Sequence, residues 1–147
     1  MSKYKTIVFD IDGTLLNTDL YICLAFLNLF QKYRKEYMPS LKELLSFSGP
    51  TLEDTFEKYF PNVDKKILFD EYERFSKENL KKYTTLYPDE ISVLDELKKR
   101  YHLAICTSRR KDAAIACLKY FDLLKYFELI ISVDDVSKPK PYPESLL

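Results

Sequence analysis

Two aspartates stand beside a glycine near the start of the chain, in the run Asp10-Ile11-Asp12-Gly13-Thr14. They follow Thr6–Phe9, an unbroken run of β-branched and aromatic residues that predicts a central parallel strand buried on both faces. Open α/β sheets bind ligands at the carboxyl ends of their strands, where these acids stand. The Asp10 carboxylate and the main-chain carbonyl of Asp12 would both reach one Mg²⁺, which prefers oxygen ligands. Taken alone, the run also suits an ordinary acidic turn.

A second polar segment follows a second predicted strand. Thr107-Ser108 comes directly after the apolar run His102–Cys106. The hydroxyls and main-chain amides of this pair would hold a phosphate, and Arg109 adds positive charge beside them. The same residues also suit a loop followed by a solvated helix start. Because parallel strands end at one edge of a sheet, we expect this segment to lie near Asp10.

A third segment, Ser137-Lys138-Pro139-Lys140-Pro141-Tyr142-Pro143-Glu144, follows a predicted strand at Leu129–Ile131. Its prolines stiffen a loop that would direct lysines toward the sheet edge, where a lysine neutralises both an aspartate and a phosphate. Alone, such a stretch is more often a surface turn. The three segments come in order, each after a separate strand, and together they point to one edge of the sheet.

The rest of the sequence predicts the elements that position these residues. Apolar residues recur at helical spacing after the first segment, so residues 17–83 are expected to be entirely helical, beginning with a helix over about 18–37. Ser40 and Glu43 form a capping-box pattern within this region. From Leu86 helices alternate with strands, which is typical of a parallel α/β sheet. Pro143 suits the first position of a further helix.

Composition excludes several classes of function. The chain has 147 residues, 46% of them hydrophobic, which suits a globular domain with a real core. Its 23 basic residues balance 23 acidic ones, so bulk charge favours neither nucleic acid nor an anionic membrane. The longest apolar stretch is shorter than the ~20 residues of a membrane span, and the N-terminus does not resemble a signal peptide. With three widely spaced cysteines, we expect a soluble, cytoplasmic protein in a reducing compartment.

These motifs resemble those of the haloacid dehalogenase superfamily of phosphohydrolases. The run Asp10-Ile11-Asp12-Gly13-Thr14-Leu15 looks like the first motif of the family, and Thr107 matches the hydroxyl-bearing residue of the second motif. Lys140, ahead of Pro141-Tyr142-Pro143-Glu144, matches the third-motif lysine better than Lys138 does.

Within the superfamily, the chain is similar to the phosphoglycolate phosphatase and pyrophosphatase-like branch, which inserts a helical cap between the first two motifs. The stretch from Ser48 to Phe56 looks like the cap loop of that branch. The resemblance implies a Rossmann-like α/β core at residues 1–16 and 84–147, with an all-helical cap at 17–83.

The resemblance also implies an activity: a Mg²⁺-dependent phosphatase acting on a small phosphorylated metabolite, either a phosphoglycolate-like monoester or pyrophosphate. Asp10 would form an aspartyl-phosphate that water hydrolyses, and Asp12 would act as general acid and then as general base. Thr107 would orient the phosphoryl group, while Lys140 and Mg²⁺ offset charge. The metal ligands would be Asp10 and Asp12. The implied substrate contacts are Ser108 and Arg109 in the core and Gly49, Pro50 and Thr51 in the cap.

The chain departs from the family after Lys140, because no fourth motif with metal-binding aspartates follows before Leu147. The resemblance therefore implies a C-terminally truncated core that lacks a metal ligand and two strands, one of which would pair with residues 7–9. We expect an exposed strand edge there, marginal stability or aggregation, and phosphatase activity near zero. Two alternatives stay open: a phosphomutase of the same fold, and a non-catalytic phosphate-binding remnant. The sequence leaves the substrate and the oligomeric state undetermined.

Overall fold

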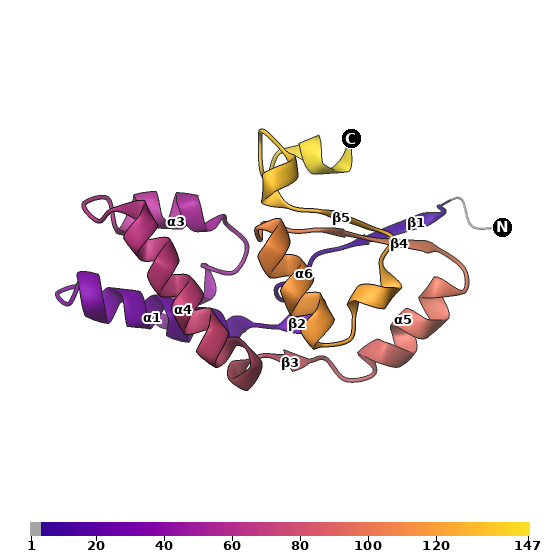
Figure 1. Cartoon of the computed structure of the whole chain (residues 1–147), viewed down its shortest axis with the longest axis horizontal. Coiled ribbons are helices and arrows are strands. Elements are labelled where there is room, and N and C mark those ends of the chain that lie inside the picture. The colour runs from indigo at the N-terminus through magenta and orange to yellow at the C-terminus, as the bar shows by residue number, and fades with distance from the viewer. Residues whose placement is uncertain (1–3) are drawn as a thin grey trace. The chain divides into compact units, whose positions relative to one another are not determined.

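Three parallel strands form the sheet that carries the candidate site residues. The computed structural model describes residues 4–147. In it β1 (Thr6–Phe9), β4 (His102–Cys106) and β5 (Leu129–Ile131) pair in the order β1-β4-β5 (Figure 1). Ala104 lies opposite Val8 on one side and opposite Leu129 on the other. The three predicted strands and their parallel pairing are confirmed, so their carboxyl ends meet at one edge of the sheet.

The chain divides into two compact units, which we describe separately. One unit contains the residues up to Leu16 together with Leu86–Leu147, and the other is Asn17–Thr85. The sequence predicts the return to the first unit at residue 84, whereas the structure places it at Leu86. Residues 1–3, which the sequence assigns to the core, lie outside the described residues.

Two short strands stand where the chain passes from one unit to the other. β2 (Leu16–Asn17) and β3 (Thr85–Leu86) pair with each other in a separate two-stranded sheet. The expectation that residues 17–83 are entirely helical is therefore wrong at Asn17. A two-residue strand carries no periodic signal, so the sequence pattern did not reveal it.

The second unit consists of helices around an aromatic core. Phe26, Phe30, Phe56 and Phe60 are each at most 2% exposed, and the rings of Phe30 and Phe60 lie with their centroids 4.7 Å apart. Such ring pairs contribute about 0.5–1.5 kcal/mol each beyond the burial of their area. The helices are α1 (Asp19–Tyr33), α2 (Leu41–Leu45), α3 (Leu52–Tyr59) and α4 (Lys65–Tyr83).

Short polar side chains fix the starts of these helices. Ser40 and Glu43 form the capping box of α2, as predicted. The Thr51 hydroxyl accepts a hydrogen bond from a main-chain N–H at the start of α3, and the Asp64 carboxylate does the same for α4. Each cap satisfies N–H groups that have no partner within the helix.

The first helix of this unit is shorter than predicted. α1 ends at Tyr33, not near residue 37. Tyr37 lies beyond the helix end, yet its ring stacks on Phe30 with a centroid distance of 5.1 Å. Tyr37 falls at helical spacing in the sequence and packs against the helix, but it does so from the turn that follows. The sequence pattern therefore made the helix too long.

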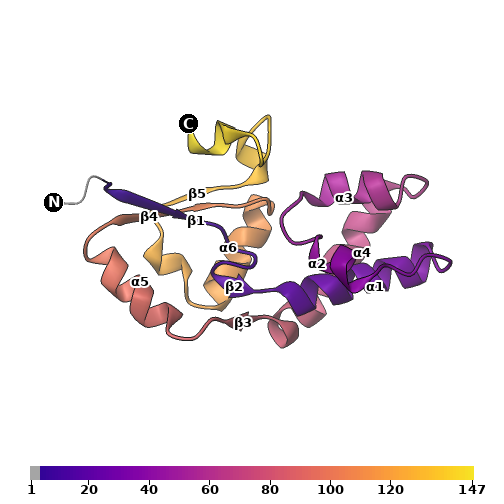
Figure 2. The same ribbon diagram turned by 180° about the vertical axis from the view of Figure 1, so that it is seen from behind.

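In the first unit, α5 (Glu90–Lys98) and α6 (Lys111–Tyr120) lie on one side of the three-stranded sheet, and the C-terminal turn lies on the other (Figures 1 and 2). Leu94 and Leu118 of these helices are at most 1% exposed, so they cover that face with apolar surface. Pro143 begins the 3₁₀ turn η3 (Pro143–Leu146) and not the α-helix expected from its position. Among residues 4–147, none of the helices is both long and apolar enough to cross a membrane.

Strand β1 lies at an edge of the sheet. Within the described part of the chain only β4 pairs with it, and the Val8 side chain is 46% exposed. The prediction of a central strand buried on both faces is therefore wrong, because the composition of a strand does not tell how many neighbours it has. The expectation of an exposed edge at residues 7–9 is confirmed.

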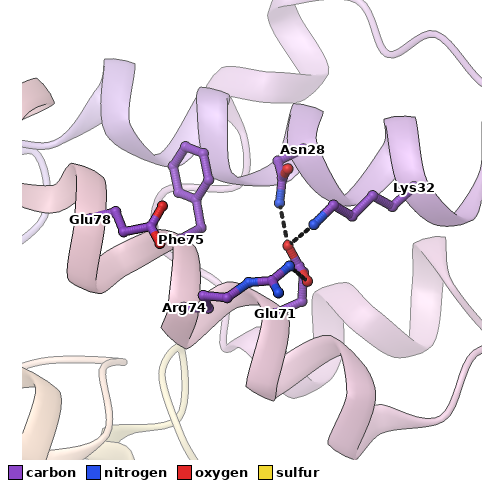
Figure 3. Close-up of a pocket in the computed structure, with 6 residues that line it drawn as sticks. All are labelled: Asn28, Lys32, Glu71, Arg74, Phe75 and Glu78. Carbon is purple, nitrogen blue, oxygen red and sulfur yellow. Dashed lines mark hydrogen bonds and ion pairs between the residues drawn. The ribbon is translucent and has the colours of Figure 1, made fainter.

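One buried carboxylate joins α1 to α4 in the second unit (Figure 3). Glu71 is 9% exposed and accepts hydrogen bonds from Arg74, Lys32 and Asn28. The hydrogen bond from Arg74, followed by those from Lys32 and Asn28, outweighs the effect of burial and lowers the pKa of Glu71 from 4.5 to about 2. The ionised carboxylate therefore stabilises the packing of the two helices. The pocket of about 250 Å³ around it is lined by Asn28, Lys32, Glu71, Arg74, Phe75 and Glu78.

We predict that Glu71→Gln lowers the free energy of unfolding at pH 7 by about 1–3 kcal/mol, because the amide leaves two cations without their carboxylate. The folded-state pKa lies below the ordinary value of 4.5, so this stabilisation is complete above pH 4.5 and is lost as the pH falls toward 2. Urea unfolding at pH 7 and pH 3 measures the difference. Glu73→Gln is the matched control, since Glu73 is 65% exposed on the same helix and pairs with Lys77. An equal loss at both pH values would contradict the prediction.

We also predict that Val8→Lys reduces self-association of the chain, because a charge on an edge strand opposes pairing between copies. Val8 is nearly half exposed, so the cost in stability should stay below about 1 kcal/mol. Sedimentation velocity at several protein concentrations measures the effect. Ile91→Lys adds the same charge at an exposed position of α5. Equal association of both variants would show that the β1 edge is not the contact.

Candidate active site

Asp10 directly follows β1, and its partner comes from the last ten residues of the chain. The Asp10 Oδ2 atom lies 3.1 Å from Lys140 Nζ, and Oδ1 accepts a 2.8 Å hydrogen bond from the Ile11 main-chain N–H. Lys140 Nζ also donates to the main-chain oxygen of Cys106, the last residue of β4, at 3.3 Å. One ammonium group thus connects the carboxyl ends of two strands.

Asp12 lies in a tight turn and pairs with an arginine. The turn contains Gly13 at φ 75°, a conformation that residues with a Cβ rarely adopt, and its N–H donates to the Leu16 oxygen at 2.8 Å. Arg109 donates to both Asp12 carboxylate oxygens, from Nε at 2.8 Å and from Nη2 at 2.7 Å. Both side chains are only 15% exposed, so the bidentate pair is largely shielded from water. The sequence predicts Arg109 as a substrate contact and gives no sign of this partner.

The segment after β4 carries two hydroxyls in different surroundings. Thr107 is 4% exposed, and its Oγ1 accepts a 3.1 Å hydrogen bond from the Arg109 main-chain N–H. Ser108 Oγ is buried and has no hydrogen-bond partner among residues 4–147. A buried hydroxyl without a partner costs about 1–3 kcal/mol, and an oxygen of a bound ligand would remove that cost.

A glutamate closes the loop that carries Lys140. The Glu144 carboxylate accepts hydrogen bonds from the main-chain N–H groups of Ser137 at 2.7 Å and Lys138 at 2.8 Å. These two bonds lower the pKa of Glu144. Lys138 lies over the Tyr142 ring, 5.6 Å from its centroid, while Lys140 reaches Asp10. The sequence motif includes Glu144, but its spacing alone does not reveal that the side chain turns back onto the loop.

A second set of contacts connects the loops after β4 and β5, and the sequence analysis did not predict it. Asp134 accepts from the Lys111 main-chain N–H at 2.8 Å, and Asp135 accepts from Lys111 Nζ at 2.7 Å. Lys111, followed by the amide and hydroxyl of Ser132, lowers the pKa of Asp135 to about 2. The Ser-x-x-Asp spacing is a capping-box signal that would have indicated Ser132 and Asp135. Nothing in the local sequence indicates Lys111.

Three of the predicted substrate contacts, Gly49, Pro50 and Thr51, belong to the other compact unit. Gly49 has a φ of 128°, which favours glycine, and Thr51 is 3% exposed at the start of α3. The approach of these three residues to a substrate stays a prediction.

The carboxylate oxygens of the site are ligands that a hard cation such as Mg²⁺ prefers, but the described acids do not form a cluster of three metal ligands. Among residues 4–147 no group of three or more His, Cys, Asp or Glu side chains could hold a metal ion. Arg109 occupies the Asp12 carboxylate, so the remaining candidate donors are the Asp10 carboxylate and main-chain oxygens of the turn. Mg²⁺ is commonly bound by one or two carboxylates, with water and phosphate completing its shell, so this donor set fits it.

We predict that Glu144→Gln loosens the lysine loop without unfolding the unit. Hydrogen exchange at the Ser137 and Lys138 amides should become about threefold to tenfold faster, because a neutral amide is a weaker acceptor than a carboxylate. Exchange measured by NMR reports each amide separately. Glu128→Gln is the control, since Glu128 is an exposed acid that pairs with His102 elsewhere. Unchanged exchange at both amides would show that Glu144 does not hold the loop.

Comparison with known proteins gives a consistent result. A sequence model described as haloacid dehalogenase-like hydrolase matches residues 7–147. Pyrophosphatase PpaX from Bacillus cereus is 32% identical over 146 residues, which cover 98% of this chain and 66% of that protein. The chain therefore spans about two thirds of the length of the curated relatives it matches.

Solved structures share the fold. A haloacid dehalogenase-like family hydrolase from Streptococcus pneumoniae has a TM-score of 0.81 at 25% identity, covering 99% of this chain and 68% of that one. A protein from Bacteroides fragilis described as haloacid dehalogenase-like has a TM-score of 0.83 at 26% identity, covering 98% and 70%. With matching motifs, fold and relatives, this chain belongs to the haloacid dehalogenase-like hydrolase family.

Proposed function

We propose that the protein is a phosphatase that carries the phosphoryl group on Asp10 during hydrolysis. The observation behind this proposal is the pairing of Asp10 with Lys140 at the edge where Thr107, Ser108 and Arg109 also stand. The Asp10 side chain is 33% exposed, which leaves room for a phosphorus atom to approach it. The lysine ammonium offsets the repulsion between an anionic nucleophile and an anionic substrate.

The proposed reaction has two steps. In the first, an Asp10 oxygen attacks the phosphorus in line, and the bond to the leaving oxygen breaks as the new bond forms. Asp12 donates a proton to the leaving oxygen. In the second step Asp12 takes a proton from water as the water oxygen attacks the phosphorus; the bond between phosphorus and the Asp10 oxygen breaks, which releases phosphate and restores the Asp10 carboxylate. The hydroxyls of Thr107 and Ser108 hold phosphoryl oxygens throughout, and Lys140 balances their charge.

Mg²⁺ is the cofactor that we propose for this site, held by Asp10 and Asp12. When bound, it would add positive charge next to the phosphoryl oxygens and so lower the barrier to attack by an anion. Asp12 would contribute its main-chain oxygen while Arg109 occupies its carboxylate. The chemistry of these donors, all of them oxygen atoms, supports Mg²⁺ over softer metals.

We propose a small phosphorylated metabolite of the cytoplasm as the substrate, either a phosphoglycolate-like monoester or pyrophosphate. The matched relative named pyrophosphatase makes pyrophosphate the first compound to test. The unit at Asn17–Thr85 is proposed as a cap that contributes Gly49, Pro50 and Thr51 to substrate binding. Closure of such a cap would exclude bulk water from the reaction.

We predict that acetyl phosphate and Mg²⁺ phosphorylate Asp10, because the carboxylate is accessible and faces a lysine that stabilises the incoming charge. Mass spectrometry after acid quenching should find one added phosphoryl group on the peptide that contains Asp10. Asp10→Asn should reduce this labelling by at least about 100-fold. Asp112→Asn is the matched control, since Asp112 is exposed on α6 and bonds only its neighbouring amide in that helix.

Hydrolysis of pyrophosphate, phosphoglycolate and p-nitrophenyl phosphate completes this test. Steady-state turnover by the 147-residue chain is expected to be near zero, because among residues 4–147 no group of three or more His, Cys, Asp or Glu side chains could hold a metal ion. Robust turnover by the wild-type chain would overturn the expected inactivity. If Asp10→Asn abolished that turnover, the result would support Asp10 as the nucleophile. Turnover or labelling that survives Asp10→Asn would exclude Asp10 as the nucleophile.

A further inference from the structure

We propose that Arg109 binds two anions in alternation: the Asp12 carboxylate when the site is empty, and the phosphoryl group when a phosphate is bound. Phosphate binding would then release Asp12 for its role in proton transfer. This inference rests on the proposed function, because it concerns the phosphate-binding step of the same site. It assigns to Arg109 a positioning role on Asp12 in addition to substrate contact.

The first argument is the geometry of the pair. Both oxygens of Asp12 accept hydrogen bonds from Arg109, at 2.8 and 2.7 Å, and both side chains are 85% withdrawn from solvent. A general acid or base must present one oxygen to the leaving group or to water. The two guanidinium N–H groups hold the carboxylate in one orientation, facing Arg109, so Asp12 is free to turn an oxygen toward a leaving group or water once Arg109 releases it.

The second argument is the position of Arg109 on the main chain. Its own N–H donates to Thr107 Oγ1 at 3.1 Å, and its carbonyl oxygen accepts from the Val133 N–H at 3.2 Å. The backbone is therefore held within its own loop and to the loop after β5 by contacts that do not involve the guanidinium. A guanidinium presents two parallel N–H groups that suit a carboxylate and a phosphate equally well. The same two N–H groups can therefore bind either anion in turn.

The third argument is the hydroxyl of the adjacent residue. Ser108 Oγ is buried and lacks a hydrogen-bond partner among residues 4–147, although the residues on either side of it are well bonded. An unsatisfied buried hydroxyl next to a guanidinium indicates that an acceptor is missing from this place when the site is empty. A phosphate oxygen is such an acceptor.

Phosphate titrations of four proteins test this alternation: wild type, Asp12→Asn, Arg109→Gln and the double variant. Inorganic phosphate is the probe, EDTA is present, and NMR follows the amides of Ser108 and residue 109 without any turnover. Asp12→Asn weakens the competing pair, so it should tighten phosphate binding about tenfold, and Arg109→Gln should weaken binding about tenfold. In the Arg109→Gln background, Asp12→Asn should change the affinity by less than about twofold.

Arg110→Gln is the control for general loss of positive charge, since Arg110 is 55% exposed and lies 3.9 Å from Asp134. It should alter phosphate binding by less than about twofold. Thermal melts of all variants confirm that each is folded before titration. If the Arg109–Asp12 pair only stabilised the fold, Asp12→Asn would not tighten phosphate binding. Tighter binding that appears only when Arg109 is present therefore supports the alternation.

Three results would overturn the alternation. Equal tightening by Asp12→Asn in both backgrounds would show simple charge repulsion, and no tightening in either would show that Asp12 does not compete. Absence of phosphate binding in all variants would also overturn it. None of these decides whether Asp10 is the nucleophile, because that question is answered by the labelling of Asp10.

Discussion

Repulsion between carboxylates is the constraint on which this site depends. Asp10 and Asp12 stand two residues apart, and two neighbouring anions repel each other unless cations lie beside them. Each acid has its own cation, Lys140 for Asp10 and Arg109 for Asp12. Both cations come from segments about 100 or more residues further along the chain. The parallel pairing of β1, β4 and β5 brings these segments to one edge, and the site exists only because that pairing holds.

The two cations are positioned by main-chain contacts that do not involve the acids. Lys140 is tied to the end of β4 through the Cys106 oxygen, and Glu144 holds the loop that precedes it. Arg109 is held by contacts of its main-chain N–H and carbonyl. Contacts that do not depend on the acids therefore hold each cation near its partner. Such an arrangement suits a site whose charges must rearrange when an anion enters.

The features that the sequence predicted correctly are those determined by residues close together in the chain. The bounds of the three strands agree with prediction because short apolar runs end there at polar residues, and the Ser40–Glu43 cap agrees because its partners are three residues apart. The end of α1 was wrong because Tyr37 packs on Phe30 from outside the helix. The exposure of Val8 and the pairing of Arg109 with Asp12 depend on neighbours distant in the chain, and no local pattern contains them.

The two acids differ in depth, and this difference fits the order of events in the proposed reaction. Asp10 is 33% exposed beside a lysine that is 31% exposed, whereas Asp12 and its arginine are each 15% exposed. A nucleophile must be reachable before any bond is formed, while a proton donor is needed only when the leaving group departs. A largely buried bidentate pair is stronger than a single contact between groups about one third exposed, so we expect Lys140 to release its carboxylate more readily than Arg109 does. In the proposed mechanism the more accessible acid, Asp10, would therefore meet the phosphate first, and binding of the phosphate would then release Asp12 from Arg109.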